Sequence, residues 1–193
     1  MAASIIDSSI FQGIFTTDAM REVWSDENRT RKYIDVERAL AIVQGRLGLI
    51  PQDAADEIVS HCHLEQIDMA RLRQQTERIG YPILGVVTQI NQLCRDKLGE
   101  YVHWGATTQD ITDTATVLQI REALQLVDDE LAAIAAAMAK LANEHRLTPI
   151  IGRSNLQQAI PVTFGYKMAG LLSAVLRHRE RLAQLKDRVL VGE

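Results

Sequence analysis

Two short polar segments of the sequence carry side chains that could bind and transform a small anion. In the first, residues 100–108, His103 precedes Thr107 and Thr108, after which no glycine or proline occurs until Pro149. A helix that begins here would offer free N–H groups and the positive end of its dipole to an anion such as a carboxylate. His103 could serve as an acid, a base or a hydrogen-bond donor to that anion. The other interpretations are that Thr108 only caps the helix and that His103 is structural.

The second polar segment, residues 152–158, brings a guanidinium, a hydroxyl and three amides into seven residues. These groups hydrogen-bond carboxylates and developing oxyanions without being consumed. They belong to Arg153, Ser154, Asn155, Gln157 and Gln158. The alternative is a polar capping loop before Pro161.

A metal site is a weaker hypothesis. His61, Cys62 and His63 are adjacent, but no second cluster of Cys or His supplies further ligands. The glycines are too scattered to form a phosphate-binding loop. We therefore expect neither a metal nor a cofactor.

Composition limits the fold class and the partners. Of 193 residues, 47% are hydrophobic and 24% are charged, which is typical of a globular protein and excludes disorder. Aromatic residues make up only 5%, with 11 glycines and 4 prolines, so an all-α fold is expected. The net charge of −4 offers no positive surface to a nucleic acid.

Membrane association and secretion are also not expected. The longest apolar stretch, residues 131–139, is too short to cross a bilayer. The first fifteen residues hold one Asp and no Lys or Arg, unlike the start of a secretory signal. Two cysteines are too few for a disulfide framework, which indicates a cytoplasmic setting.

Residue types that begin and end helices predict five short helices before residue 100. They are expected over residues 18–24, 26–47, 52–60, 69–79 and 82–99. Thr17 or Asp18, Ser25 and Asp68 can cap three of them. The second helix carries an apolar stripe that is expected to face the core: Tyr33, Val36, Leu40, Val43 and Leu47.

Two long helices are predicted after residue 107. The first starts at Thr108, and about 38 residues of helix would be about 57 Å long. Its apolar seam is Val117, Ile120, Leu124, Val127, Leu131, Ile134, Met138 and Leu141. The second starts at Pro161, and its seam is Phe164, Met168, Leu171, Val175, His178, Leu182, Leu185 and Val189. The short connection predicts antiparallel neighbours, whose wide apolar faces need further partners.

The two polar segments resemble a known superfamily. Residues 101–115, Tyr-Val-His-Trp-Gly-Ala-Thr-Thr-Gln-Asp-Ile-Thr-Asp-Thr-Ala, resemble the first conserved region of the fumarase/aspartase superfamily. Residues 152–159, Gly-Arg-Ser-Asn-Leu-Gln-Gln-Ala, resemble its second region. Residues 19–29 and 36–40 are similar to the N-terminal domain of its members. The pattern is most similar to 3-carboxy-cis,cis-muconate cycloisomerases, followed by adenylosuccinate lyases.

The resemblance implies a three-domain, all-α fold and a homotetramer with a twenty-helix core. Residues 1–107 would form a small N-terminal helical domain, and residues 108–193 would begin the central long-helix bundle. Active sites would combine three subunits, and the catalytic Ser of the third conserved region, Gly-Ser-Ser-x-Met-Pro, has no counterpart in this sequence. We therefore expect less than half of a family member, ending inside the central domain, with little or no turnover by itself.

Some residues depart from the adenylosuccinate lyase pattern. Asn155 stands where those enzymes carry a His that serves as general acid. Residues 80–83, Gly-Tyr-Pro-Ile, lack another expected His, and no nucleotide-binding Arg-Tyr pair occurs near the start. These differences disfavour a nucleotide and favour a small polycarboxylate as substrate.

The resulting hypothesis is a cofactor-free reaction beside a carboxylate, in the form of 3-carboxy-cis,cis-muconate lactonisation in aromatic degradation. The residues assigned to catalysis are His103, Thr108 and Asn155, and those assigned to substrate binding are Thr107, Arg153, Gln157 and Gln158. One alternative is a lyase that cleaves an amino-substituted dicarboxylate. The other is a non-catalytic helical assembly module.

Overall fold

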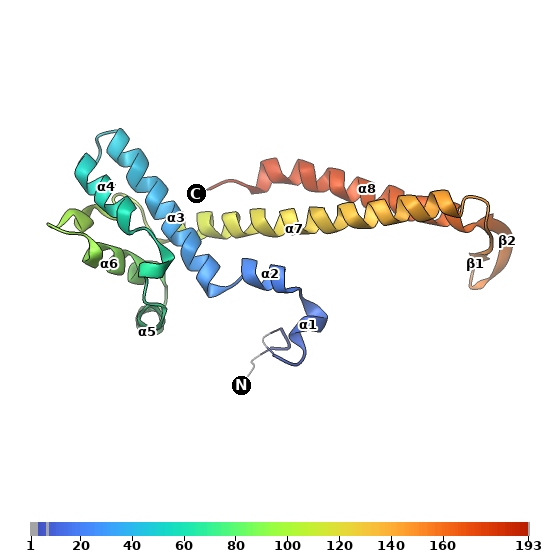
Figure 1. Cartoon of the computed structure of the whole chain (residues 1–193), viewed down its shortest axis with the longest axis horizontal. Coiled ribbons are helices and arrows are strands. Elements are labelled where there is room, and N and C mark those ends of the chain that lie inside the picture. Colours follow the sequence, from blue (N-terminus) through green and yellow to red (C-terminus); the bar gives the residue numbers. More distant parts are fainter. Residues whose placement is uncertain (1–3, 7, 193) are drawn as a thin grey trace. The chain divides into compact units, whose positions relative to one another are not determined.

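The computed structural model describes residues 4–6 and 8–192 of the chain, and in this part the fold is helical (Figure 1). The elements are α1 (Gln12–Phe15), α2 (Asp18–Val23), α3 (Asp26–Arg46), α4 (Gln52–His61), the 3-10 helix η1 (Leu64–Gln66), α5 (Met69–Ile79), α6 (Ile83–Leu93), the 3-10 helix η2 (Leu98–Tyr101), α7 (Thr108–Glu144), β1 (Pro149–Ser154), β2 (Gln157–Thr163) and α8 (Phe164–Val189). The prediction of an all-α protein is confirmed. None of the described helices is long and apolar enough to span a membrane.

The chain divides into two compact units. One unit comprises Met1–Glu122 with Leu190–Glu193, and the other comprises Ala123–Val189. Helix α7 contributes its first turns to one unit and the remainder to the other. This division concerns packing, and the domain boundary proposed at residue 108 stays a prediction.

The predicted helix starts are confirmed at three side-chain caps. The hydroxyls of Thr17 and Ser25 accept hydrogen bonds from the N–H groups of Met20 (3.2 Å) and Asn28 (3.1 Å). The carboxylate of Asp68 accepts one from the N–H of Arg71 at 3.0 Å. Each cap satisfies an N–H group that has no partner within its helix.

The end of α6 differs from the prediction. The helix stops at Leu93 instead of continuing to Gly99. Asp96 and Lys97 then adopt φ values of 50° and 63°, a left-handed conformation that an α-helix cannot contain. The chain turns here before η2.

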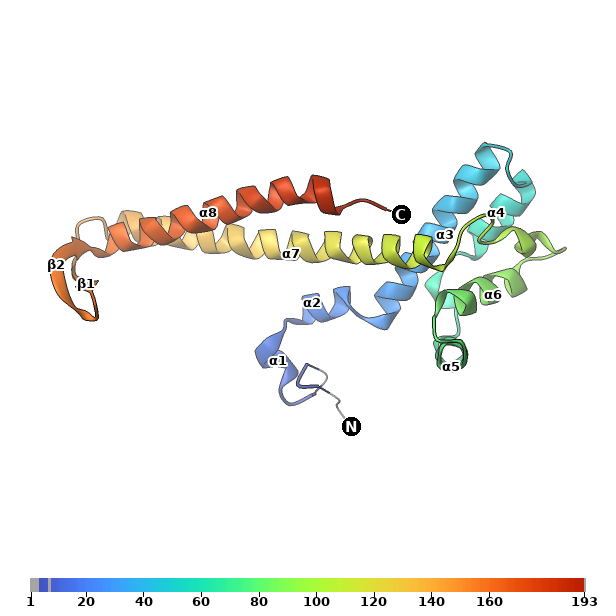
Figure 2. The ribbon, with the colours of Figure 1, turned by 180° about the vertical axis from the view of Figure 1, so that it is seen from behind.

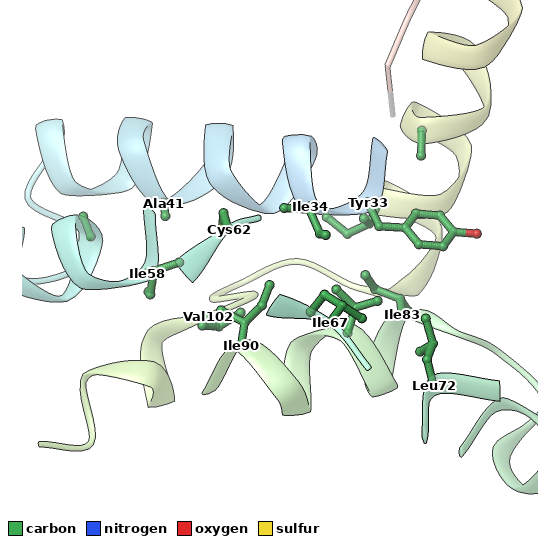
Figure 3. Packing of buried hydrophobic residues seen from close by; sticks show 14 of the residues in the cluster. Tyr33, Ile34, Ala41, Ile58, Cys62, Ile67, Leu72, Ile83, Ile90 and Val102 are labelled. Atoms are coloured by element: carbon green, nitrogen blue, oxygen red, sulfur yellow. The ribbon is translucent and has the colours of Figure 1, made fainter. Parts of the chain in front are cut away.

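The core of the first unit lies between α3, α4 and α6. Figure 3 shows Ile34 of α3, Ile58 of α4 and Ile90 of α6 pointing into this core, and each is at most 2% exposed. The predicted apolar stripe is buried only in part, because Tyr33 is 5% exposed whereas Val43 and Leu47 are 50% and 68% exposed. The residues that α3 does bury on its inner face include Tyr33, Ile34, Glu37, Ala41, Gln44 and Gly45.

Small residues explain this choice of face. A Cβ placed on Gly45 of α3 would lie 2.6 Å from the Cβ of Ala55 in α4. Ala41 and Ala55 are also buried, so the two helices can approach closely along this side. The resulting contact turns Glu37 and Gln44 inward.

The second unit contains the rest of α7, the hairpin β1–β2 and α8. Figures 1 and 2 show α8 running back beside α7 in both views. Arg179 of α8 donates from Nε and Nη2 to the carboxylate of Asp128 in α7 at 2.8 and 3.3 Å. Parts of both predicted seams stay open to solvent in one chain, where Val127 and Leu171 are 39% and 46% exposed. Two helices alone therefore do not cover their apolar faces.

The connection between α7 and α8 was expected to be a polar loop, and this expectation is wrong. The chain forms an antiparallel hairpin, with Arg153 paired to Gln158 and Ser154 paired to Gln157. β-branched residues in both strands favour this structure, and they are Ile150, Ile151, Ile160, Val162 and Thr163. Pro161 lies within β2, so α8 begins three residues later, at Phe164.

The close approach of α3 and α4 gives a first prediction. Gly45→Ala is expected to lower the free energy of unfolding by about 1–3 kcal/mol, because the new methyl group collides with Ala55. Urea unfolding followed by circular dichroism measures the change.

The control is Ala39→Gly at an exposed position of the same helix, which reports backbone propensity alone and should cost about 1 kcal/mol. If packing did not matter, Gly45→Ala would stabilise the helix by a similar amount. Such a gain would contradict the proposed contact.

Candidate functional site

A short loop between η2 and α7 carries His103 and Trp104. His103 has φ 63° and Gly105 has φ 71°, so the backbone reverses direction within three residues. A left-handed conformation is uncommon for a residue other than glycine and occurs often at functional sites. The loop leads directly into the first turn of α7 at Thr108.

Two buried side chains of α3 hold this loop. The Nδ1 of His103 lies 2.5 Å from Oε1 of Glu37, whose side chain is 1% exposed. The Nε2 of Gln44 donates to the carbonyl oxygen of Trp104 at 2.7 Å. Glu37 and Gln44 are seven residues apart and therefore lie on the same side of α3, two turns from each other. The loop is thus fixed at two successive residues.

The charge of His103 follows from these contacts. Its pKa is raised above the usual range, chiefly by the hydrogen bond to Glu37 and also by the charges of Glu37 and Asp110, against the opposing effect of burial. A raised pKa favours the imidazolium at neutral pH. Its Nδ1–H is committed to Glu37, so Nε2–H is the donor left for a ligand.

The start of α7 differs in detail from the prediction. The helix begins at Thr108, so Thr107 and not Thr108 occupies the cap position. The N–H of Thr107 donates to Oδ2 of Asp110 at 2.7 Å. One donor is therefore satisfied internally, and an anion would use the N–H groups that follow in the first turn.

The second polar set lies on the hairpin of the other unit. Arg153, Asn155, Gln157 and Gln158 are all exposed. Asn155 and Leu156 form the turn with φ values of 48° and 65°, as in a two-residue hairpin turn of the primed type. Leu156 is 97% exposed at the tip.

Strand geometry divides the predicted substrate-binding residues of the hairpin. Directly paired residues share a face of a sheet, and successive residues alternate between faces. Arg153 and Gln158 therefore share one face, whereas Gln157 lies on the other face with Ser154. The expectation of a polar loop did not separate the two glutamines.

The structure groups His103, Thr107 and Thr108 in the first unit, and Arg153, Asn155, Gln157 and Gln158 in the second. Sequence reasoning missed Glu37 and Gln44 as supports of the first group. The only signal was a pair of polar residues at a seven-residue spacing, and its meaning depends on which face of α3 is buried.

The adjacent residues His61, Cys62 and His63 have other environments. His61 lies within hydrogen-bonding distance of Glu57 (3.3 Å) and Gln66 (3.1 Å). Cys62 is buried in the core, where burial raises the pKa of its thiol to about 12. Among the described residues, no group of three or more His, Cys, Asp or Glu is placed to hold a metal ion.

Comparisons with known proteins identify a family and several relatives of this chain. The lyase family matches residues 13–193. Trans-aconitate decarboxylase 1 of Mycosarcoma maydis is 56% identical over 180 residues, which are 93% of this chain and 36% of that protein. N-acetyl-S-(2-succino)cysteine lyase of Dickeya dadantii (strain 3937) is 41% identical over 192 residues, which are 100% of this chain and 42% of that protein.

Solved structures agree with the sequence matches. The crystal structure of 3-carboxy-cis,cis-muconate lactonizing enzyme from Pseudomonas putida matches with a TM-score of 0.90 and 38% identity, covering 96% of this chain and 43% of that one. Adenylosuccinate lyases and a 3-carboxy-cis,cis-muconate cycloisomerase are also among the relatives.

The helical fold is that of part of a 3-carboxy-cis,cis-muconate lactonizing enzyme of known structure. The chain belongs to the lyase family of the fumarase/aspartase superfamily, as the resemblance predicted. It spans 36% to 43% of the length of the relatives described above.

The contact between His103 and Glu37 gives a second prediction. Because the pKa of His103 is raised in the folded state, the contact with Glu37 stabilises the fold fully at a pH below the ordinary pKa of about 6.5. This stabilisation is lost as the pH rises through the folded-state pKa. The stability difference between the wild type and His103→Gln should therefore shrink as the pH rises above the ordinary value of about 6.5.

Urea unfolding at a series of pH values measures this difference. The matched control is His63→Gln, since His63 is exposed. A wild-type advantage over His103→Gln that stays constant across the range would contradict the prediction.

Proposed function

We propose that the full-length protein catalyses a cofactor-free addition or elimination beside a carboxylate of a small polycarboxylate. In its specific form the reaction is the lactonisation of 3-carboxy-cis,cis-muconate. The observation that carries the proposal is the clamped His103, held by a buried carboxylate next to the first turn of α7. An imidazolium and a helix N-terminus side by side favour a ligand with several negative charges.

The chemistry requires stabilisation of a carbanion. A proton on carbon beside a carboxylate is too weakly acidic to leave unless the negative charge spreads into that carboxylate. The resulting dianion needs donors placed in advance where its charge develops. Thr107, Thr108 and the helix N-terminus would bind this carboxylate.

The hairpin would supply the remaining donors. Arg153 and Gln158 share a face of the hairpin and would donate hydrogen bonds to the substrate together. Asn155 at the turn would donate to the negative charge that develops during the reaction. Gln157 lies on the other face of the hairpin, so it would not contact the same small substrate as Arg153 and Gln158. The base would come from the third conserved region, whose Gly-Ser-Ser-x-Met-Pro pattern is not in these 193 residues.

The two sets of residues belong to different units of the chain. The superfamily resemblance implies active sites that combine three subunits, so the two sets would come from different copies of the chain. The half-exposed seams of α7 and α8 offer the contact surface, and a homotetramer is the assembly that the superfamily resemblance implies.

Two other reactions have support from the relatives. The 56% identical relative is named trans-aconitate decarboxylase, and trans-aconitate, like carboxymuconate, is an unsaturated tricarboxylate. Adenylosuccinate lyase and N-acetyl-S-(2-succino)cysteine lyase favour elimination from a substituted dicarboxylate. A helical assembly module without catalysis is the remaining alternative.

A third prediction tests the reaction. The full-length protein is expected to convert 3-carboxy-cis,cis-muconate to a lactone in the absence of added metal or cofactor. Proton NMR of the products measures this conversion. Trans-aconitate, adenylosuccinate and N-acetyl-S-(2-succino)cysteine are the competing substrates. The 193-residue chain alone should show little or no turnover.

Variants separate an enzyme from an assembly module. Thr108→Ala and Arg153→Ala should each lower kcat/KM by about 100- to 1,000-fold, because each removes a donor to the developing charge. Thr88→Ala in α6 and Arg71→Ala in α5 are matched controls that belong to neither polar set, and they should have little effect. Tolerance of both test variants would support the assembly module and overturn the proposal.

A fourth prediction tests assembly of the site from different copies. Thr108→Ala and Arg153→Ala proteins, each nearly inactive, are unfolded together, refolded as a mixture and assayed. If one copy supplies Thr108 and another supplies Arg153, about a quarter of the sites regain both wild-type residues. Activity that does not exceed the mean of the two separate variants would show that both residues come from a single copy.

A further inference from the structure

We propose that Glu37 is a positioning residue that makes His103 a hydrogen-bonding cation for the substrate, acting through Nε2–H, and not the base of the reaction. This inference rests on the proposed function only for the identity of the ligand. The arrangement of Glu37 and His103 belongs to the chain itself.

The first support is the geometry of the pair. Oε1 of Glu37 lies 2.5 Å from Nδ1 of His103, and the Glu37 side chain is 1% exposed against 20% for His103. A carboxylate in this place accepts Nδ1–H and holds the ring in one orientation. With Nδ1 engaged by Glu37, Nε2 is the ring nitrogen left for another partner.

The second support is the isolation of Glu37. Its other oxygen, Oε2, is buried and has no hydrogen-bond partner in the described part of the chain. A buried carboxylate with one partner depends strongly on that partner, since burial without compensation is costly. The interaction thus favours a proton on His103 as well as fixing its orientation.

The third support is the set of charges around the ring. The groups that face His103 are Glu37 from α3 and Asp110 from the first turn of α7, and both are acidic. A base must be able to take up a proton at the working pH, whereas these two groups keep the proton on the ring. His103 is therefore suited to donate a hydrogen bond to an anion.

Gln44 provides the matched comparison. It holds the neighbouring residue of the same loop, through the carbonyl oxygen of Trp104, but it carries no charge. If Glu37 only fixed the loop, loss of either side chain would have the same consequence. If it also sets the charge of His103, only the loss of Glu37 changes the titration.

A fifth prediction uses the variants Glu37→Gln and Gln44→Leu in the full-length protein. Glu37→Gln retains an acceptor for Nδ1–H and removes the charge, so the shape of the loop is preserved. Hydrogen–deuterium exchange at the imidazole C2 position, measured by mass spectrometry on peptides, gives the titration midpoint of each histidine without any substrate. The exposed His63 is the internal reference.

In the wild type the midpoint of His103 should lie above the ordinary value of about 6.5. In Glu37→Gln it should fall by about one pH unit or more. In Gln44→Leu it should stay near the wild-type value. Equal midpoints in the wild type and Glu37→Gln would overturn the inference, and so would a wild-type midpoint at or below the ordinary value.

Kinetics supply the functional test. With the substrate found above, Glu37→Gln should raise KM by about 10-fold or more at a pH between the two midpoints, because the cation is lost, with a smaller effect on kcat. At a pH below both midpoints the KM of the variant should return toward the wild-type value. Gln44→Leu should show no such pH dependence.

The substrate assay and the exchange measurement test different proposals, so a negative result in one does not decide the other. If the wild type turns over none of the substrates, the proposed function is wrong, while the exchange midpoints still decide whether Glu37 controls the charge of His103. A KM that rises equally at every pH in Glu37→Gln would reduce Glu37 to a structural support.

Discussion

The close packing of α3 against α4 is the constraint on which the site depends. A glycine at position 45 lets α4 approach so closely that a methyl group would meet Ala55 at 2.6 Å. This contact fixes the rotation of α3 about its own axis. Once the rotation is fixed, Glu37 and Gln44 point inward, and polar groups in such a place need partners. The loop at His103 and Trp104 supplies these partners, so helix packing determines the position and the charge of the histidine.

The same packing has a cost at the outer face of α3. Val43 and Leu47 remain largely exposed, although their spacing is that of a buried stripe. Apolar surface of this kind commonly marks contact with other protein surface. The seams of α7 and α8 show the same feature in the second unit. Both units therefore present surface that one copy of these residues does not cover.

In the hairpin β1–β2, successive side chains alternate between two faces, and this decides which of them can bind one ligand together. A polar loop would have allowed Arg153, Asn155, Gln157 and Gln158 to converge on one ligand. The strands instead direct Arg153 and Gln158 to one face and Gln157 to the other. Leu156 occupies a left-handed conformation at the tip, where glycine would be less strained. Strained backbone conformations cluster at functional sites, so the tip of the hairpin is a candidate contact point.

The sequence by itself determined the features that depend on near neighbours in the chain. Thr17, Ser25 and Asp68 mark helix starts because a cap acts within three residues, and the absence of glycine and proline after Thr108 marks one long helix. The family was also predicted, since its motifs at residues 101–115 and 152–159 are continuous in sequence. Only the tertiary structure decided which face of α3 is buried, and with it the role of Glu37. That choice depends on contact between helices, and the periodicity of one helix does not contain it.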